Sequence, residues 1–420
     1  MTPPRVRIKR AIARALRVAL LRYVRAAPRA ASLDAAHRRV FIFLWAADGM
    51  GGTIRAALTL AEYLVERDYE VEIISGIRDR DPPFFGAFPA GVRVTALDDR
   101  RQGAEPRGPT RLVRRVLRRR RSMLMPSEDR ASTSFSMWTD LRLAHTLRGR
   151  SGFLLSTRPG LNMMAVRLRV PGLTLIGLEQ MNLSKRSREL RRAMKRHYPS
   201  LDALVVLTDE DQRAYHELLR GKIPLYRIPN TVRALPGAKA DLASKTVYAA
   251  GRFRVQKGFD LLIPAYAAVV ARHPDWRLRL RGTGLLKVRL EELIRQHGLG
   301  DVVSLEGPAE DIGADMAEAS VFVLSSRFEG FPLILLEAMS KGMAVVTFDC
   351  PTGPADIVQD HRNGILVPPK DIDGLADAML EMIEYETLRR DCAAAAVETA
   401  QQYTIEAIGP KWVELLRTLS

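Results

Sequence analysis

The sequence has few of the residues that build covalent or metal-based sites. Only two cysteines, Cys350 and Cys392, occur among 420 residues, which excludes a framework of disulfide bonds and favours a reducing compartment. The seven histidines show no HxH or HExxH spacing, so no zinc site of that type is expected. A serine nucleophile elbow and a Cys/His arrangement are also missing, which argues against covalent catalysis by those groups.

Long apolar runs are missing as well. No stretch of about 20 apolar residues occurs, so no segment is expected to span a membrane. The N-terminus is basic, but it lacks a continuous apolar core before a small-residue cleavage site, and a secretory signal is not expected. The sequence therefore predicts a cytoplasmic protein.

Two familiar phosphate-binding patterns are absent. Residues 49–52 read GMGG, which is neither GxGxxG nor a Walker loop with its lysine. Dinucleotide binding and ATP hydrolysis are therefore not favoured. Three Asp-x-Asp triplets occur, at residues 79–81, 209–211 and 371–373. We interpret these acids as helix caps and surface charges rather than as metal ligands.

What the chain has in excess is basic residues, and they are unevenly placed. The net charge is +17, with +24 in residues 1–240 and −7 in residues 241–420. A basic half of this kind predicts an anionic partner. Three segments carry the excess: 1–29, 107–121 and 185–196. The first has the pattern of a basic amphipathic helix lying in a lipid headgroup layer, with a disordered basic tail as the alternative.

The remaining chain alternates short apolar strands with helical patterns, which predicts two α/β domains with parallel sheets. Residues 1–39 form the basic N-terminal segment, and a first Rossmann-like domain is expected over 40–235. A second such domain is expected over 240–404, after a linker rich in Ala, Pro, Gly and Ser. The final helix, 405–420, is expected to cross back onto the first domain. Ligands of such sheets bind outside the carboxyl ends of the strands.

The stretch RFEGFPLILLEAMSKG places Glu329 in the loop after a predicted strand and Glu337 on an otherwise apolar helix. A carboxylate at Glu337 should be paired or functional, although it could instead reach solvent from the helix flank. Pro332 suits the first position of this helix. The free N–H groups at its start, from Leu333 onward, could hold a phosphate.

A second set of residues lies in AGRFRVQKGFD, after the first strand of the second domain. Arg252 and Lys257 are two cations on one loop, as the neutralisation of a diphosphate leaving group requires. The alternative is a pair of solvated loop charges. In the first domain, the glycines of GMGG would let backbone N–H groups approach phosphate oxygens at a helix start.

Together these motifs resemble the family-four retaining glycosyltransferases of the GT-B fold, over most of the chain from about residue 40. The stretches FDCPTGPADIV and NGILVP are also similar to this family. The pattern STRPGLN…LEQMN…LDALVVLTDED…IPNTV resembles a bacterial branch that builds cell-surface polysaccharides and teichoic-acid-type polymers. The fold implied is α/β, with two Rossmann-like domains whose parallel sheets face each other across a cleft.

The resemblance implies a role for each matching position. Glu329 would bind the hydroxyls of the donor sugar and Glu337 the ribose hydroxyls of the nucleotide. Arg252 and Lys257 would neutralise the diphosphate. The remaining donor-binding positions would act through their backbone: Gly51, Gly52, Gly330, Phe331, Pro332 and Leu333. The family keeps the anomeric configuration and commonly needs no bound metal, so no cofactor is expected beyond the nucleotide-sugar substrate.

One position departs from the pattern. Members of this branch often carry Glu-His where this chain has Glu179 and Gln180. A histidine there commonly contacts donor sugar or acceptor, and Gln180 cannot carry a proton at physiological pH. The resemblance still implies contacts of Glu179 and Gln180 with sugar or acceptor, but the departure puts either catalytic efficiency or donor preference in doubt.

The resulting hypothesis is a metal-independent, retaining hexosyltransferase. It would use a nucleotide sugar, with a UDP-sugar favoured, and a lipid-linked or polymeric cell-envelope glycan as acceptor. Its basic segments would dock it on the inner face of the bacterial membrane. Two alternatives remain at this stage: transfer to a small soluble acceptor, or a non-catalytic protein that binds nucleotide sugars or nucleic acid. Nucleic acid is disfavoured because the arginine clusters lack interleaved aromatics.

Overall fold

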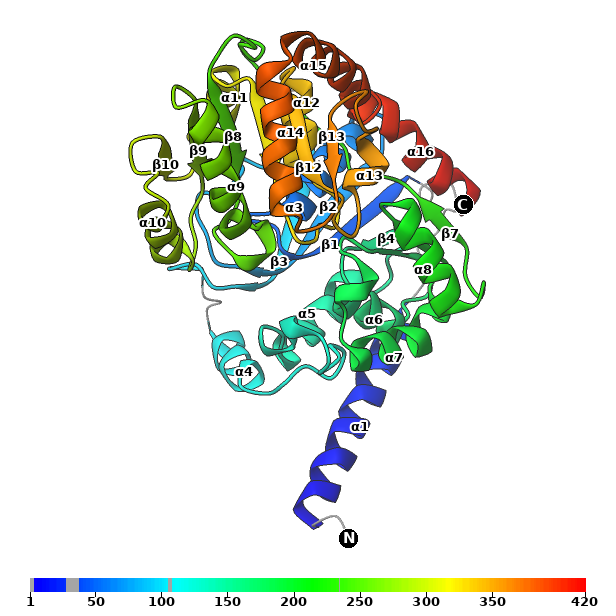
Figure 1. Ribbon diagram of the computed structural model, residues 1–420. Coiled ribbons are helices and arrows are strands. Elements are labelled where there is room, and N and C mark those ends of the chain that lie inside the picture. The colour runs from blue at the N-terminus through cyan, green and yellow to red at the C-terminus, as the bar shows by residue number, and fades with distance from the viewer. Residues whose placement is uncertain (1–3, 28–37, 105–107, 234) are drawn as a thin grey trace. The chain divides into compact units, whose positions relative to one another are not determined.

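The computed structural model describes residues 4–27, 38–104, 108–233 and 235–420 (Figure 1). The chain divides into two compact units. Unit 1 comprises Met1–Val206, Asp211–Ile228 and Gly409–Ser420. Unit 2 comprises Leu207–Glu210 and Pro229–Ile408.

Unit 1 is built on a seven-stranded sheet with the strand order β3-β2-β1-β4-β5-β6-β7. Every neighbouring pair is parallel. The central strands are buried on both faces, which is why they read as short continuous apolar runs such as VFIFLWA. The strands are β1 (Arg39–Ala46), β2 (Glu70–Arg78), β3 (Arg93–Asp99), β4 (Gly152–Ser156), β5 (Leu173–Leu178), β6 (Ala203–Val206) and β7 (Leu225–Arg227).

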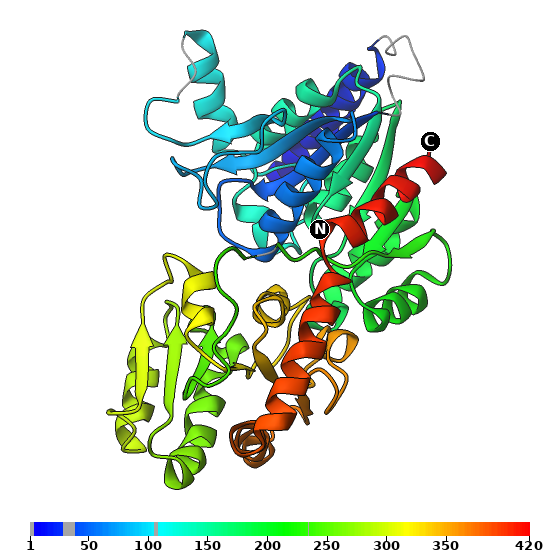
Figure 2. The same cartoon turned by 90° about the horizontal axis from the view of Figure 1, so that it is seen from above.

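The helices of unit 1 cover this sheet (Figure 2). They are α1 (Pro4–Arg25), α3 (Gly52–Val65), α4 (Pro109–Arg118), α5 (Met137–Leu147), α6 (Pro159–Leu168), α7 (Arg188–His197) and α8 (Asp209–Leu219). The last helix of the chain, α16 (Ile405–Thr418), belongs to this unit from Gly409 onward. Short 3-10 helices lie at η1 (Arg130–Thr133), η2 (Leu183–Lys185) and η3 (Tyr198–Ser200).

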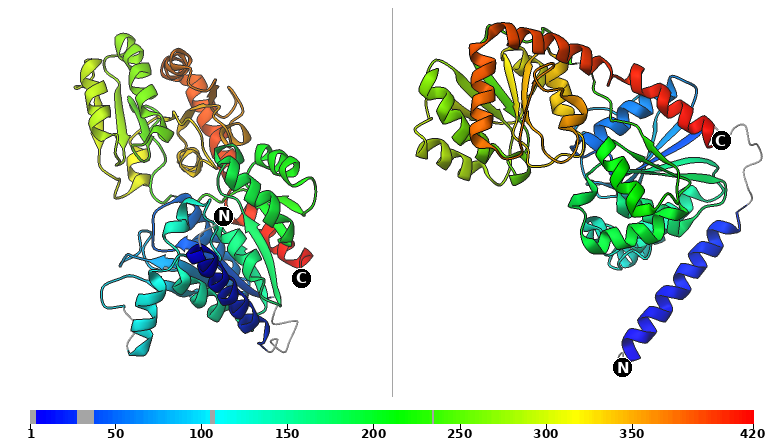
Figure 3. Two further views of the ribbon diagram at one scale, coloured as in Figure 1. Left: turned by 90° about the horizontal axis from the view of Figure 1, so that it is seen from below. Right: turned by 45° about the vertical axis from the view of Figure 1, so that its right-hand side comes forward.

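Helix α1 occupies part of the basic N-terminal segment. Its C-terminal end packs on unit 1, because Leu20 and Val24 are buried in the core and Tyr23 OH lies 3.0 Å from His145 Nδ1. Figure 3 shows the rest of the helix extending away from this contact. Among the described residues, no helix has both the length and the apolar character needed to cross a bilayer.

Unit 2 repeats the same plan with six parallel strands in the order β10-β9-β8-β11-β12-β13. The strands are β8 (Thr246–Ala250), β9 (Arg277–Arg281), β10 (Val303–Glu306), β11 (Val321–Leu324), β12 (Ala344–Phe348) and β13 (Ile365–Val367). The helices are η4 (Val255–Lys257), α9 (Phe259–Arg272), α10 (Lys287–Gln296), α11 (Ile312–Ala317), α12 (Leu333–Ser340), α13 (Pro354–Ile357), α14 (Ile372–Glu384) and α15 (Glu386–Gln401).

Both sheets have a point where the strand order reverses. In unit 1 this point lies between β1 and β4, and in unit 2 it lies between β8 and β11. At such a point the loops after the two strands diverge to opposite faces and leave a crevice at the carboxyl edge, where open α/β sheets bind their ligands. We therefore expect the ligand-binding site of unit 2 at the loops after β8 and β11.

The predicted fold class is confirmed. Each apolar run interpreted as a strand from the sequence is a strand of one of the two parallel sheets. The sequence placed Pro332 at the first position of a helix, whereas α12 begins one residue later and Pro332 is its N-cap.

Candidate functional site

The loop after β8 carries the two cations predicted from the sequence. Arg252 is exposed, whereas the side chain of Lys257 is 15% exposed. Between them the chain makes the short η4 turn, which ends at Gly258 with φ of 66°. A β-carbon at Gly258 would overlap the carbonyl oxygen of Ser325. Glycine is needed here both for its left-handed conformation and for the close approach of the loop after β11.

The loop after β11 carries Glu329, and its carboxylate is the centre of the site. Oε1 of Glu329 lies 2.7 Å from Nζ of Lys257 and accepts a hydrogen bond of 2.6 Å from Oγ of Ser326. Glu329 is 7% exposed. A charged pair with little solvent around it is held more firmly than a surface pair. The sequence predicted that Lys257 and Glu329 bind the same nucleotide sugar, but it revealed neither their ion pair nor Ser326.

The loops after β8 and β11 are joined along their length by hydrogen bonds. Ser325 Oγ donates to the Lys257 carbonyl at 3.0 Å, and Arg327 N donates to the Gln256 carbonyl at 2.8 Å. Gln256 Nε2 donates to the Phe328 carbonyl at 3.1 Å. These bonds fix the backbone on both sides of the Lys257–Glu329 pair, so the pair is positioned by the scaffold and not by its own attraction alone.

An outer ion pair supports the same junction. Arg327 contacts both oxygens of Asp260 at 2.6 and 2.7 Å, and it donates to the Val255 carbonyl at 2.9 Å. Asp260 lies in the first turn of α9. The bidentate geometry ties the loop after β11 to the helix that follows the loop after β8.

A third loop, after β12, completes the wall beside Glu329. Glu329 N donates to the Pro351 carbonyl at 3.1 Å, and Thr352 Oγ1 donates to the Glu329 carbonyl at 2.9 Å. Cys350 is buried in this loop. Burial, reinforced by the charge of Glu329, raises the pKa of the Cys350 thiol to about 12. The thiol is therefore protonated at neutral pH and is not a nucleophile.

The start of α12 differs from the sequence expectation. Leu333 N donates to the Phe331 carbonyl at 3.0 Å and Leu335 N donates to the Pro332 carbonyl at 2.9 Å. Because these bonds are made within the turn, fewer free N–H groups face a ligand than the sequence predicted. Phe331 is 9% exposed and its ring packs on Tyr403, with the centroids 5.7 Å apart.

Glu337 lies further along α12 and is 4% exposed, so the alternative of a solvent-facing carboxylate is wrong. The resemblance gave four residues a role at one nucleotide sugar, and the structure joins two of them directly, Lys257 and Glu329. Arg252 lies exposed on the same loop as Lys257, and Glu337 lies buried on the helix that follows Glu329.

The site lies in a segment that is similar to a known protein family. Residues 237–399 match the model of glycosyl transferases group 1. The matched segment covers most of unit 2 and includes Arg252, Lys257, Glu329 and Glu337. Unit 1 lies outside the matched residues.

Two curated relatives extend the similarity over both units. The exopolysaccharide phosphotransferase SCO2592 of Streptomyces coelicolor is 32% identical over 386 residues, covering 90% of this chain but only 40% of that protein. The amylovoran biosynthesis glycosyltransferase AmsD of Erwinia amylovora is 24% identical over 389 residues, covering 90% of this chain and 99% of that protein.

Among solved structures, that of a mutant of S. aureus TarM, in complex with Fondaparinux, alpha-GlcNAc-glycerol and UDP, is similar with a TM-score of 0.71 at 15% identity. The match covers 90% of this chain and 99% of that one. This likeness shows that the fold is GT-B, with two Rossmann-like units.

In unit 1, the glycine-rich turn follows β1 at the reversal of the strand order. Gly51 is the N-cap of α3, and a β-carbon at Gly51 would meet no atom within 4 Å. Asp48, just before the turn, is 1% exposed and accepts hydrogen bonds from the backbone N–H groups of Asp79 and Arg80. The sequence did not point to Asp48, whose role is to hold the loop after β2 beside the glycines.

The side chain of Glu179 is enclosed by residues of unit 1. It is 2% exposed; its Oε1 accepts hydrogen bonds from Tyr198 OH and, at 3.1 Å, from Asn162 Nδ2, and its Oε2 accepts one at 3.0 Å from Arg186. Burial raises the pKa of Glu179, and Arg186 opposes that shift. The carboxylate of Glu179 is therefore held by side chains of unit 1, and its expected contact with sugar or acceptor stays a prediction. Gln180, the next residue, is half-buried.

The Asp-x-Asp triplets behave mainly as expected. Asp371 caps α14 by accepting from Gly374 N, and Asp81 pairs with Arg101 at 2.7 Å. Asp211 is the exception, because it is 3% exposed and accepts from Leu183 N at 3.2 Å. No group of three or more histidine, cysteine or acidic residues suited to a metal ion occurs in the described part of the chain.

Proposed function

We propose that this chain is a retaining glycosyltransferase. It moves a hexosyl unit from a nucleotide sugar, with UDP as the nucleotide, to a hydroxyl of a lipid-linked or polymeric cell-envelope glycan. The observation that carries the proposal is the Lys257–Glu329 pair at the strand reversal of the group 1 glycosyltransferase domain. A fixed cation beside a fixed carboxylate can hold an activated sugar from both ends, at the diphosphate and at the hydroxyls.

In this proposal each residue has one task. Lys257 and Arg252 bind the diphosphate and stabilise the charge that grows on it. Glu329, held by Ser326 and the loop after β12, accepts hydrogen bonds from the sugar hydroxyls. Glu337 binds the ribose hydroxyls, for which a buried carboxylate on α12 is a suitable acceptor. The backbone N–H groups of Gly51 and Gly52 also bind the diphosphate in this proposal.

The chemistry is a substitution on one face of the sugar. The acceptor oxygen bonds to the anomeric carbon on the face from which the diphosphate departs. The bond between that carbon and the diphosphate oxygen breaks, and its electron pair leaves with the phosphate. The acceptor's proton passes to the departing phosphate oxygen, so no separate base is required. In this proposal Lys257 and Arg252 supply the positive charge for this step, and that task is not assigned to a metal ion.

The acceptor class rests on the relatives and on the charge of unit 1. AmsD is named for amylovoran biosynthesis, and the TarM structure contains alpha-GlcNAc-glycerol. Most arginines of α4 and of the residues that follow it, 119–121, are exposed. On the same helix, Leu112, Val113 and Val116 are 66%, 44% and 51% exposed. Apolar side chains among arginines suit an anionic membrane surface, where such an acceptor is made. Residues 1–29 and 185–196 add further positive charge to that proposed contact.

A donor screen tests the proposal. UDP-, GDP- and dTDP-hexoses are incubated with the wild-type chain, and release of the free nucleotide is measured with and without a glycan acceptor. We expect hydrolysis or transfer with one UDP-sugar and its loss in Glu329→Gln, which keeps the size of the side chain but removes its charge. Turnover that is unchanged in Glu329→Gln, or absent with every donor, would contradict the proposal.

A further inference from the structure

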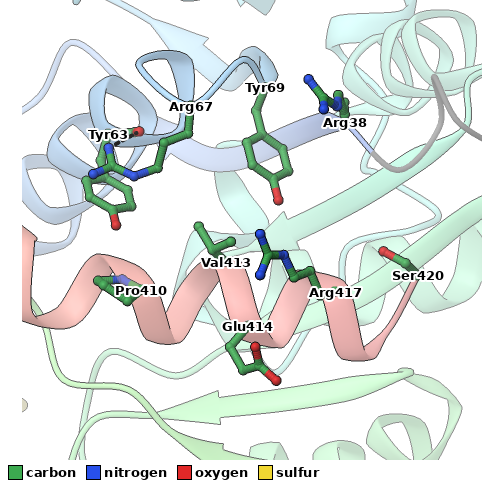
Figure 4. Close-up of a pocket in the computed structure, with 9 residues that line it drawn as sticks. All are labelled: Arg38, Tyr63, Arg67, Tyr69, Pro410, Val413, Glu414, Arg417 and Ser420. Carbon is green, nitrogen blue, oxygen red and sulfur yellow. Dashed lines mark hydrogen bonds between the residues drawn. The ribbon is translucent and has the colours of Figure 1, made fainter.

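Unit 1 contains a cavity that has no part in the site described above. It has a volume of about 920 Å³ and lies between the C-terminal half of α16 and the segment that follows α3 (Figure 4). Three arginines and two tyrosines dominate its lining. The lining residues are Arg38, Tyr63, Arg67, Tyr69, Pro410, Val413, Glu414, Arg417 and Ser420.

The arginines of the cavity are poorly neutralised. Neither Arg38 nor Arg417 makes an ion pair with any residue that the structure describes, and Arg67 reaches only Glu66, at 3.6 Å. Glu70, which follows Tyr69 in the chain, forms its ion pair with Arg39, at 2.6 Å. Guanidinium groups that line one hollow with so little neutralising charge favour the binding of an anion there.

One arginine is held in a fixed orientation. The guanidinium of Arg67 lies 3.4 Å from the centre of the Tyr63 ring, and its Nη1 donates to the Tyr63 carbonyl at 3.1 Å. Tyr63 is 3% exposed and packs against α16, because a β-carbon at Gly409 would overlap its ring. The stacked guanidinium keeps other N–H groups available, and it loses little side-chain entropy when it binds a phosphate.

The opposite wall presents matching groups. Figure 4 shows Arg417 and Tyr69 extending toward one another from α16 and from the segment after α3. Glu414 is the single acid of the lining, against three arginines, so the lining carries a net positive charge. Val413 and Pro410 add an apolar surface to this wall.

The size of the cavity restricts the ligand. It is far larger than a phosphate ion and lies within the range of sites that enclose organic ligands. Tyrosine faces and short apolar side chains suit the carbon face of a sugar or polyol, and the arginines suit phosphate oxygens. We propose that this cavity binds a phosphate-bearing glycan or polyol chain, at a second site that holds the polymer during sugar transfer. The choice of a polymer rests on the proposed function, whereas the preference for phosphate rests on the cavity alone.

Calorimetry on the full chain tests the inference with three soluble probes: inorganic phosphate, a synthetic glycerol-phosphate trimer and a neutral trisaccharide. We expect the trimer to bind at least about tenfold more tightly than phosphate, and the trisaccharide not to bind measurably. Arg417→Ala should weaken trimer binding by about tenfold or more. The matched control is Lys411→Ala, which removes one charge from an exposed position of the same helix outside the cavity and should change the affinity by less than about twofold.

The result also separates this inference from the proposed function. Lys257→Met, which should lose use of the donor, should still bind the trimer with wild-type affinity. Because Arg417 is exposed, a thermal unfolding scan of Arg417→Ala should match the wild type, so a loss of binding cannot be ascribed to misfolding. Trimer binding that is equal in Arg417→Ala and wild type, or binding only to phosphatidylglycerol vesicles and to none of the soluble probes, would overturn the assignment.

Discussion

The ammonium of Lys257 lies 2.7 Å from the carboxylate of Glu329, although the two residues come from loops after different strands of unit 2. The pair lies where the strand order of the sheet reverses, and hydrogen bonds of the loops after β8, β11 and β12 hold it in place. A ligand that enters this crevice meets a positive and a negative group at a set spacing. The proposed reaction depends on that spacing more than on either residue alone.

Removing the cation of this pair should abolish most sugar transfer. Lys257→Met keeps the length of the side chain but cannot neutralise the leaving diphosphate, and it leaves Glu329 without its ion-pair partner. We expect kcat/KM for transfer to fall by about 100-fold or more. Arg254→Met is the matched control, since Arg254 is exposed on the same loop. Equal losses in both variants would assign the effect to general charge rather than to the pair.

The close approach of the two loops at Gly258 gives a prediction about stability. Gly258→Ala places a β-carbon at φ of 66° against the Ser325 carbonyl, so the loops must separate. The free energy of unfolding should fall by more than about 2 kcal/mol, as measured by denaturant titration. Gly300→Ala, where a β-carbon meets nothing within 4 Å, should change it by less than about 0.5 kcal/mol. Similar values for the two variants would show that the loops do not meet at this point.

A buried acid of unit 1 gives a prediction about pH. Asp140 is 1% exposed, and burial raises its pKa from 3.8 to about 6, although Ser122 and two backbone N–H groups donate to it. Because the pKa of Asp140 is higher in the folded state, Asp140 loses its proton at a lower pH in the unfolded chain than in the folded one. The contribution of Asp140 to stability therefore decreases as the pH rises from about 4 to about 6.

The Asp140→Asn variant has no such titration. The difference in unfolding free energy, variant minus wild type, should rise across the same pH range by up to about 3 kcal/mol. Denaturant titrations of both proteins at intervals between pH 4 and pH 7 measure it. A difference that stays constant with pH would show that Asp140 is not shifted.

The exposed apolar side chains of α4 give a prediction about membranes. Replacing Leu112, Val113 and Val116 by serine should reduce binding to vesicles containing phosphatidylglycerol by about tenfold or more, with stability unchanged because all three are exposed. The control replaces Leu285 and Val288 of unit 2, which are 87% and 76% exposed. Vesicle sedimentation measures both. Wild-type binding by the α4 variant would remove this helix from the proposed membrane contact.

The fold could be predicted from the sequence because its strands are buried on both faces. Runs such as VFIFLWA and VFVLSS cannot be mistaken for amphipathic surfaces, and their alternation with helical patterns leaves few topologies. The position of Glu329 followed from the same reasoning, since a loop after such a strand opens at the ligand-binding edge.

The rest of the site depended on contacts between distant segments. Nothing in the local sequence shows that Ser326 donates to Glu329, that Gln256 reaches the Phe328 carbonyl, or that Asp48 holds the loop after β2. The enclosure of Glu179 could not be predicted from the sequence for the same reason. Its partners Asn162, Arg186 and Tyr198 lie up to 19 residues away along the chain, and only the packed structure shows that they enclose it.

The central claim is that Lys257 belongs to a site for an activated sugar, and binding of UDP tests it most directly. Calorimetry on the wild type, Lys257→Met and Arg254→Met isolates donor binding from acceptor and membrane. The account predicts measurable UDP binding to the wild type, a loss of about tenfold or more in Lys257→Met, and no change in Arg254→Met. Equal affinity in the wild type and Lys257→Met would contradict it.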